Sequence, residues 1–376
     1  MRTDDIFRAC LIGGAVGDAL GYAVEFMQAS DIFRKYGEKG ITDYELFHGT
    51  AQISDDTQMS LFTATGLLLG TTRGKLRGIM APYEDYIRYS YKDWYRTQTE
   101  PFPLPEEYHH SWLVNVPELF SRRAPGNTCM SALASSEKGS LANPINHSKG
   151  CGGVMRAAPI GLYFAGKRIS TQKSDLIGGE AAAITHGHEL GWLPSAALVH
   201  IIRHLTEQDG DISAAVQDAM LMLPKVFPEA RKMNDLLALL QKAVDLSRMD
   251  LCDLDAIGQL GQGWFGDEAL AIAVYCALKH PESFEDAIIA AVNHSGDSDS
   301  TGSIAGNIVG ASLGLGAIPK KYLETLELRD VILELADDLF NDCQMTEYGE
   351  YRDPVWLAKY VHMDYRPDRQ RKRAGL

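Results

Sequence analysis

The stretch NHSGDSDSTGSIAGNIVGASLG, residues 293–314, carries the strongest structural signal in this 376-residue chain. Two aspartates and four hydroxyl side chains fall within residues 294–302, at the start of an apolar pattern with helical spacing. Glycine then recurs at every fourth position, although each glycine inside a helix costs about 1 kcal/mol relative to alanine. The stretch therefore needs two explanations, one in packing for the glycines and one in chemistry for the oxygen-bearing side chains.

The glycine spacing predicts that two helices cross at close range. Residues four apart lie on one face of a helix, and the first helical segment has glycines with the same spacing over residues 13–21. Charged residues around both segments exclude a membrane dimer seam. We expect this crossing to bring Glu25 close to Asp297 and Asp299; ordinary core packing with no role in a site is the alternative.

Apolar residues with helical spacing dominate the rest of the chain, and the alternating pattern of strands is almost absent. Prolines and glycines interrupt the pattern, but no stretch resembles a long flexible linker. The sequence therefore predicts an all-α fold, a compact, single-domain orthogonal helical bundle. Helices are expected over residues 4–21, 56–69, 176–206, 212–224, 232–246, 266–279, 284–293, 301–314 and 328–340.

Composition limits the classes of function. With a net charge of −14 and a pI near 5.2, the chain lacks the broad basic face of a general nucleic-acid binder. Six cysteines form no CxxC pair, which indicates reduced thiols. No signal peptide is recognisable, and no apolar run approaches the roughly 20 residues of a membrane span. We expect a cytoplasmic protein without membrane association, and a solvated basic tail over residues 366–376, with electrostatic docking of that tail as the alternative.

Acidic residues occur in unusual settings in three stretches. These are residues 17–26 with Asp18 and Glu25, residues 54–58 (SDDTQ), and the stretch quoted above. The last two could be simple helix N-caps. A cap needs one residue, however, and each of these helix starts has two aspartates with neighbouring hydroxyls. Carboxylates and hydroxyls are the ligands of hard divalent cations, so a metal site explains the surplus.

The acidic stretches predict a two-metal centre if the fold brings them together. Two like charges about 4 Å apart repel by roughly 4 kcal/mol at an effective dielectric near 20, so cations must neutralise such a cluster. Two divalent ions nearly balance five negative charges. The carboxylates concerned are Glu25, Asp55, Asp56, Asp297 and Asp299.

Seven motifs, in this order, resemble those of the ADP-ribosylglycohydrolase family, of the dinitrogenase-reductase-activating and ADP-ribosyl-acceptor hydrolase type. They are GDALGYAVEF (17–26), SDDTQ (54–58), RAPGNT (123–128), NHSKGCGGVMRAAPIGL (146–162), THGH (185–188), GWFGDEAL (263–270) and HSGDSDSTGSIAG (294–306). The resemblance implies a glycohydrolase domain over residues 1–345, followed by a C-terminal extension with a basic tail over residues 346–376. It also implies two divalent cations, Mg²⁺ or Mn²⁺, as cofactors.

The resemblance implies roles for individual residues at the metals. The family motifs usually read TDD and GDTDT, and the SDD and GDSDS found here keep every hydroxyl. The implied metal ligands are Ser54, Asp55, Asp56, Asp297, Asp299 and Ser300. Asp56 or Asp297 is expected to accept the proton of the attacking water, and Glu25 is expected to act as a mobile gate at the metals.

A small-residue loop over residues 148–153 could bring backbone amides to a diphosphate. On its own such a loop is a turn, because it has no P-loop ending. Trp264 or Phe265 could stack on adenine or pack on ribose, and His186 is expected near the distal ribose or a phosphate; core packing is the alternative for each. The expected ADP-ribose-binding residues are Ser148, Gly150, Cys151, Gly152, Gly153, His186 and Trp264.

The implied reaction is hydrolysis of the bond between the anomeric carbon of ADP-ribose and an acceptor, by attack of a metal-activated water. The expected partners are an ADP-ribosylated protein as substrate, most simply modified on arginine, and ADP-ribose as product. Serine-, nucleic-acid- and small-molecule-linked ADP-ribose are alternatives. A different class of function is an immunity or antitoxin protein that binds and occludes an ADP-ribosyltransferase; a two-metal phosphoester hydrolase or a non-catalytic relative is a further alternative.

An acid at the mouth of the site would hold a leaving guanidinium cation. The candidates are Asp93, Glu100, Glu106 and Glu107, for which a solvated loop is the alternative.

Overall fold

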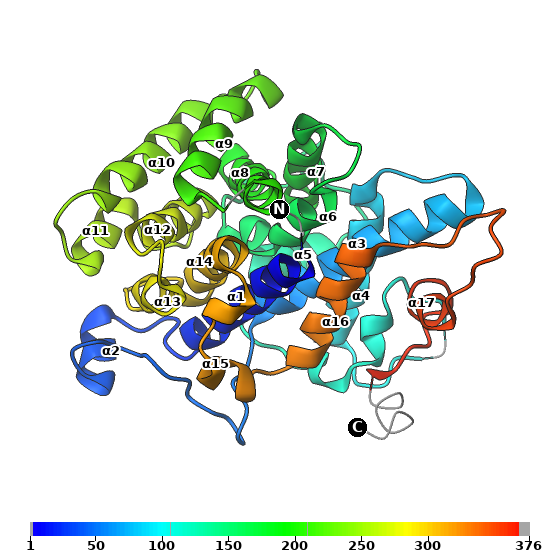
Figure 1. The fold of residues 1–376 in the computed structure, drawn as a ribbon, viewed down its shortest axis with the longest axis horizontal. Helices are drawn as coiled ribbons and strands as arrows, with labels where there is room; N and C mark the ends of the chain where they lie inside the picture. The colour runs from blue at the N-terminus through cyan, green and yellow to red at the C-terminus, as the bar shows by residue number, and fades with distance from the viewer. Residues whose placement is uncertain (1–2, 106, 209, 368–376) are drawn as a thin grey trace.

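Two helices with glycines along one face cross at the centre of the molecule, α1 (Asp4–Tyr22) and α14 (Ser298–Leu313) (Figure 1). The structure is a computed structural model that describes residues 3–105, 107–208 and 210–367. A Cβ atom added to Gly306 would lie 2.0 Å from the carbonyl oxygen of Gly13, and one added to Gly302 would lie 2.5 Å from that of Gly17. No side chain fits between the two backbones, so the close crossing predicted from the glycine spacing is confirmed.

The other helices of the described residues surround this pair. They are α2 (Ala29–Tyr36), α3 (Asp55–Arg77), α4 (Tyr83–Thr99), α5 (Asn127–Ala134), α6 (Ala158–Phe164), α7 (Thr171–Ala183), α8 (Glu189–Glu207), α9 (Ile212–Val226), α10 (Met233–Ser247), α11 (Asp253–Leu260), α12 (Gly266–Lys279), α13 (Phe284–Val292), α15 (Lys320–Glu324), α16 (Arg329–Asn341) and α17 (Pro354–Leu357). Short helical turns are η1 (Trp112–Asn115), η2 (Pro117–Leu119), η3 (Cys151–Arg156), η4 (Leu315–Ala317) and η5 (Ala358–His362). In Figure 1, α12 and α13 lie on one side of the central pair and α16 on the other.

One hydrophobic core runs through nearly all of these helices. Within the described ranges, β structure is limited to isolated bridges, such as the one between Ala51 and Leu326. The expected all-α, compact single domain is therefore confirmed. None of the helices in those ranges is both long enough and apolar enough to span a membrane. Residues 368–376, the larger part of the expected basic tail, lie outside the described residues.

The prediction of one helix over residues 176–206 is wrong. The helix is interrupted between α7 and α8. His188 caps α8, because its Nδ1 accepts the backbone N–H of Leu190 at 3.0 Å. At Gly187 an added Cβ would lie 2.2 Å from the carbonyl oxygen of Asn146, so a neighbouring loop packs into the break. The apolar spacing continues on both sides, which hides the break in the sequence.

Asp18, in the middle of α1, fixes the start of α3. Its buried carboxylate accepts the backbone N–H of Ser54 at 3.0 Å, the backbone N–H of Thr57 at 3.1 Å and the hydroxyl of Thr57 at 2.5 Å. These groups include donors that the first turn of a helix leaves without partners. Burial, and then the nearby charge of Asp299, raises the pKa of Asp18 to about 7. A buried side chain of α1 thus places the first turn of α3 beside α1.

Candidate metal centre and active site

Three segments far apart in the sequence meet at one cavity of about 670 Å³. The loop of residues 122–129 and the start of η3 form its other walls. Five carboxylates line this acidic cavity: Glu25 after α1, Asp55 and Asp56 at the start of α3, and Asp297 and Asp299 at the start of α14. The convergence expected from the sequence is present.

The carboxylates lie close together, and their charges are not balanced. One oxygen from each of Glu25, Asp297 and Asp299 lies within 4.8 Å of the other two. Glu25 Oε2 and Asp56 Oδ1 are buried without a hydrogen-bond partner. Throughout the described part of the chain, no lysine, arginine or histidine forms an ion pair with any of the five. Such an oxygen-only donor set is the kind that hard divalent cations bind.

Burial raises the pKa of Asp55, Asp56 and Asp297 well above the usual range, and neighbouring carboxylates, Asp299 first among them, raise it further. The same two causes raise the pKa of Glu25 to about 11. The charged forms are disfavoured because they lack both water and counter-charge. A bound cation would supply that counter-charge, so these residues fit the divalent metal that the family resemblance implies.

Backbone geometry presents the α14 acids to the cavity. Ser300 donates its backbone N–H to Asp297 Oδ1 at 3.3 Å and to Asp299 Oδ1 at 2.9 Å. The Cys151 thiol lies 2.8 Å from Asp297 Oδ2. Just before them, Gly296 allows a close approach, since an added Cβ would lie 1.9 Å from the carbonyl oxygen of Gln262. These contacts hold the two aspartates against the cavity before any ligand binds.

The sequence pattern of the ADP-ribosylglycohydrolase family matches residues 1–349. The chain belongs to this family. It is 26% identical over 322 residues to the ADP-ribosyl-[dinitrogen reductase] glycohydrolase of Rhodospirillum rubrum, over 85% of this chain and 89% of that protein. It is 27% identical over 208 residues to the mouse ADP-ribosylhydrolase ARH3, over 48% of this chain and 53% of that protein. A solved ADP-ribosylglycohydrolase-related protein complex shares the fold, with a TM-score of 0.59, 24% identity, and coverage of 90% of this chain and 98% of that one.

Most of the residues that the glycohydrolase motifs pointed to line the acidic cavity. Besides the five carboxylates these are Gly150, Cys151, Gly152, His186, Trp264 and Ser300. Ser148 lines an adjoining hollow of about 600 Å³ that shares Thr128 with the acidic cavity, and the hydroxyls of Ser148 and Thr128 lie 3.0 Å apart. The roles of all these residues as ligands or as binding groups remain predictions.

Two residues of the expected site, Ser54 and Gly153, are not among those that line the cavity, although each adjoins a residue that does. The hydroxyl of Ser54 accepts the backbone N–H of Asp56 at 3.2 Å, so Ser54 is the N-cap of α3 and is not among the residues that line the cavity. Gly153 packs against α8, where an added Cβ would lie 2.5 Å from the carbonyl oxygen of Gly191. Its smallness serves helix packing, whereas Gly150 and Gly152 face the cavity.

Two cavity residues could not be assigned from the sequence. Phe26 follows Glu25 in the left-handed region, at φ 67°, with 67% of its surface exposed, and it stacks on Trp264 with ring centroids 5.5 Å apart. A left-handed conformation is strained for a bulky side chain. Arg122 also lines the cavity. Phe26 is the last residue of the first motif and Arg122 directly precedes the motif of residues 123–128, but nothing in the sequence gave either of them a role. Of the two aromatics considered from the sequence, Trp264 lines the cavity, whereas Phe265 does not and carries Lys149 Nζ over its ring at 3.6 Å.

The acids considered for the mouth of the site have structural partners. Glu100 and Glu107 both pair with Arg96. Asp93 accepts the backbone N–H groups of His110 and Ser111, at 2.6 and 2.9 Å. None of these three carboxylates is among the residues that line the acidic cavity, and Glu106 lies outside the described residues.

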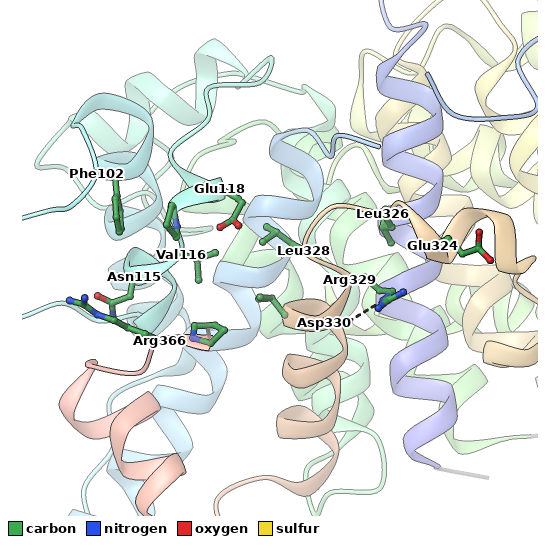
Figure 2. A pocket seen from close by; sticks show the side chains of 13 residues that line it. Phe102, Asn115, Val116, Glu118, Glu324, Leu326, Leu328, Arg329, Asp330 and Arg366 are labelled. Carbon is green, nitrogen blue, oxygen red and sulfur yellow. Dashed lines mark hydrogen bonds and ion pairs between the residues drawn. The ribbon is translucent and has the colours of Figure 1, made fainter. Parts of the chain in front are cut away.

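A second cavity, of about 410 Å³, lies beside the start of α16 (Figure 2). Val116, Leu326 and Leu328 give it apolar walls, and Arg329 pairs with Asp330 at 3.0 Å within it. It contains no cluster of unpaired buried acids among its described residues, so the acidic cavity is the candidate active site.

Proposed function

We propose that this glycohydrolase removes ADP-ribose from arginine side chains of modified proteins. Family membership establishes the coarser statement, hydrolytic removal of ADP-ribose. The Rhodospirillum rubrum relative is named for a protein that carries ADP-ribose, dinitrogen reductase, which supports a protein substrate. Arginine is supported by chemistry, because its guanidine leaves as a cation and the acid-rich cavity favours a departing positive charge.

The metal half of the proposed site consists of Glu25, Asp55, Asp56, Asp297 and Asp299, with the Ser300 hydroxyl beside them. We propose that they hold two ions, Mg²⁺ or Mn²⁺. The Ser54 hydroxyl caps α3 and keeps a second lone pair, so its role as a ligand stays a prediction. When bound, divalent ions lower the pKa of water and orient hydroxyl groups of a substrate. Glu25 comes from a turn after α1, not from a helix, so its side chain suits the role of a gate.

The reaction at the sugar needs a proton acceptor for the attacking water. Asp56 and Asp297 are the candidates, since both are buried in the cavity wall and Asp56 Oδ1 has no hydrogen-bond partner. Water attacks the anomeric carbon as the aspartate accepts its proton, the bond to the acceptor nitrogen breaks, and the aspartate passes that proton to the nitrogen as the guanidine leaves. The modified protein and one water thus give free ADP-ribose and an unmodified arginine side chain.

The nucleotide half of the proposed site is the wall that carries Gly150, Gly152, His186 and Trp264. Absent side chains at the two glycines leave backbone groups open to a diphosphate. The cavity and the adjoining hollow together offer about 670 and 600 Å³, which is the scale of a small-molecule site.

The observation that carries the proposal is the group of unbalanced carboxylates of Glu25, Asp297 and Asp299 within 4.8 Å. The test is a panel of arginine-, serine- and DNA-linked ADP-ribose, incubated with the protein in Mg²⁺ or Mn²⁺, with and without chelator. We expect release from arginine at least about tenfold faster than from the other two, and loss of release with chelator. Faster release from serine or DNA would overturn the acceptor, and chelator-resistant release would overturn the metal centre.

The relatives carry the names of hydrolases, and nothing in them supports a protein that binds and occludes an ADP-ribosyltransferase. Asp297→Ala separates the two functions, because turnover should be lost whereas occlusion of a transferase would persist.

A further inference from the structure

Behind the acidic cavity lies a buried arginine without an acidic partner. Arg156 is 1% exposed, and in the described residues no carboxylate forms an ion pair with it. One terminal nitrogen lies 3.3 Å from the sulfur of Met59 and 3.2 Å from that of Cys129, and Tyr91 stacks at 4.5 Å from the guanidinium carbon. Buried arginines are normally paired with acids, so this one needs another reason to be there.

The other terminal nitrogen of Arg156 starts a chain of hydrogen bonds. It donates to the hydroxyl oxygen of Thr185 at 2.6 Å, and that oxygen lies 2.8 Å from Nδ1 of His186. Arginine can only donate, and a hydroxyl has one proton to give. Two other groups lie near this hydroxyl, the carbonyl oxygen of Ala182 at 3.4 Å and the thiol of Cys129, which is a weak acceptor. The Thr185 hydroxyl therefore donates its proton to the nearer group, Nδ1 of His186.

An imidazole that accepts at Nδ1 carries its proton on Nε2 when it is neutral. Burial, and then the charge of Arg156, lowers the pKa of His186 to about 3, so the ring is neutral near physiological pH. Burial and, to a smaller extent, the charge of Arg156 keep the ring uncharged, and the hydrogen bond from Arg156 to Thr185 sets the direction of the bond to His186.

The Nε2 edge of His186 faces the glycine loop of the cavity. A Cβ added at Gly150 would lie 3.4 Å from Nε2, and one at Gly152 would lie 3.0 Å from Cε1. Within the described ranges, no protein group accepts a hydrogen bond from Nε2. The loop thus leaves this donor free for a ligand.

We infer that Arg156 is a positioning residue, which acts through Thr185 to hold His186 in the tautomer that presents Nε2–H to an acceptor oxygen of the bound ligand. The inference rests on the proposed function for the identity of that oxygen, a phosphate or ribose oxygen of ADP-ribose. A neutral donor suits this cavity, because a cationic side chain in the same place would pair with the metal-binding carboxylates. The buried charge of Arg156 adds a favourable field for an anion; it also acts on Asp55 through space, but it forms no ion pair with that carboxylate in the described residues.

The first test measures the tautomer itself, in full-length, metal-free protein labelled with ¹⁵N at histidine. We expect the His186 resonances, assigned by their loss in His186→Gln, to show a protonated Nε2 and an unprotonated Nδ1. Thr185→Val should shift the ring towards the other tautomer, and Thr185→Ser should restore it. The matched control is Thr206→Val, which removes a buried hydroxyl that donates to Ile202 in α8. A protonated Nδ1 in the native protein, or no response to Thr185→Val, would overturn the inference.

The second test measures affinity for free ADP-ribose by calorimetry. Thr185→Val should weaken binding about tenfold, the scale of one hydrogen bond to a charged group, and should raise KM more than it lowers kcat. Arg156→Met should act in the same direction; if it fails to fold, Thr185→Val carries the test alone. A tautomer that responds while affinity does not would overturn the role in binding. A responsive tautomer in a protein that neither binds nor releases ADP-ribose would leave the hydrogen-bond chain standing and overturn the proposed function.

Discussion

The acidic cavity and the second cavity, about 670 and 410 Å³, differ in how their charges are balanced. In the smaller one, charged groups such as Glu118 and Glu324 are exposed, and Arg329 has Asp330 as its partner (Figure 2). In the acidic cavity, buried carboxylates face one another, and within the described residues none of the five forms an ion pair with a basic side chain. Unpaired buried charge opposes folding, so its presence calls for a functional reason that the exposed and paired charges of the second cavity do not need.

The largest expected effect comes from removing one acid of the unbalanced cluster. Asp299→Asn should lower ADP-ribose release at least about a thousandfold, or about 4 kcal/mol, because it removes a metal ligand. The same change should stabilise the chelator-treated protein by about 1 kcal/mol or more, since it relieves repulsion among carboxylates. Release assays and urea denaturation in chelator measure the two effects.

The matched control is Asp330→Asn in the second cavity, which removes a partly exposed acid that has a partner. It should change the free energy of unfolding by less than about 0.5 kcal/mol and leave release unaltered. The contrast between the cavities fails if Asp299→Asn destabilises the metal-free protein, because the loss of activity could then follow from unfolding.

The convergence of acids at one cavity could be predicted because the signals were local. Glycines at every fourth residue of α1 and α14 encode a close crossing, and an excess of acids at a helix start is visible without a structure. The two expected site residues that do not line the cavity have structural roles that the sequence did not show. Ser54 and Gly153 could be ligand residues by type, and only their neighbours in space, Asp56 and Gly191, show a cap and a packing contact.

What the sequence did not reveal depends on contacts between distant segments. The hydrogen bonds from Arg156 through Thr185 to His186 join residues that no motif connects. Helix α4 was missed for a simpler reason. Its buried face is built from Ile87, Tyr91 and Trp94, at helical spacing, and an aromatic-rich, polar segment gives a weak apolar pattern.

Between the two cavities lies a buried ion pair, and breaking it is the next largest effect. Glu327 follows Leu326 of the second cavity, bonds Arg123 at 2.8 Å, and accepts the backbone N–H of Ile53 at 3.1 Å, directly before the start of α3. Glu327→Ala should destabilise the protein by about 3–5 kcal/mol, because it leaves a buried guanidinium unpaired. Urea denaturation measures the loss.

The control for this pair is the double variant Arg123→Met with Glu327→Leu, which removes both charges. It should recover most of the stability lost in Glu327→Ala, since no unpaired charge remains buried. Equal losses in the single and double variants would mean that packing around Glu327, rather than its charge, stabilises this region.

A smaller effect on stability is expected at the crossing of α1 and α14, which supports the acidic cavity but not the second cavity. Gly306→Ala places a Cβ atom 2.0 Å from the backbone of Gly13 and should destabilise the protein by about 1–3 kcal/mol. The control is Gly258→Ala in α11, where an added Cβ meets no atom within 4 Å, so a gain of about 0.4–1 kcal/mol is expected. Thermal unfolding measures both variants. Equal effects at the two sites would show that the two helices can move apart at the crossing without loss of stability.

The smallest expected effect tests buried charge that does have partners. His200 bonds Asp175 at 2.9 Å and Asp218 at 3.0 Å; burial lowers its pKa, but these carboxylates raise it above its ordinary value overall. A raised histidine pKa contributes stability that is present below the unfolded value and lost as pH rises through the folded one. Because Asp218 is 45% exposed, Asp218→Asn should cost only about 0.2–1 kcal/mol near pH 6 and less near pH 8. In the control Asp235→Asn the lysine partner stays charged, so the loss there should be the same at both pH values. An equal loss of stability for Asp218→Asn at both pH values would show that His200 is uncharged. Asp175 and Asp218 would then have no positive charge beside them, and the contrast with the acidic cavity would fail.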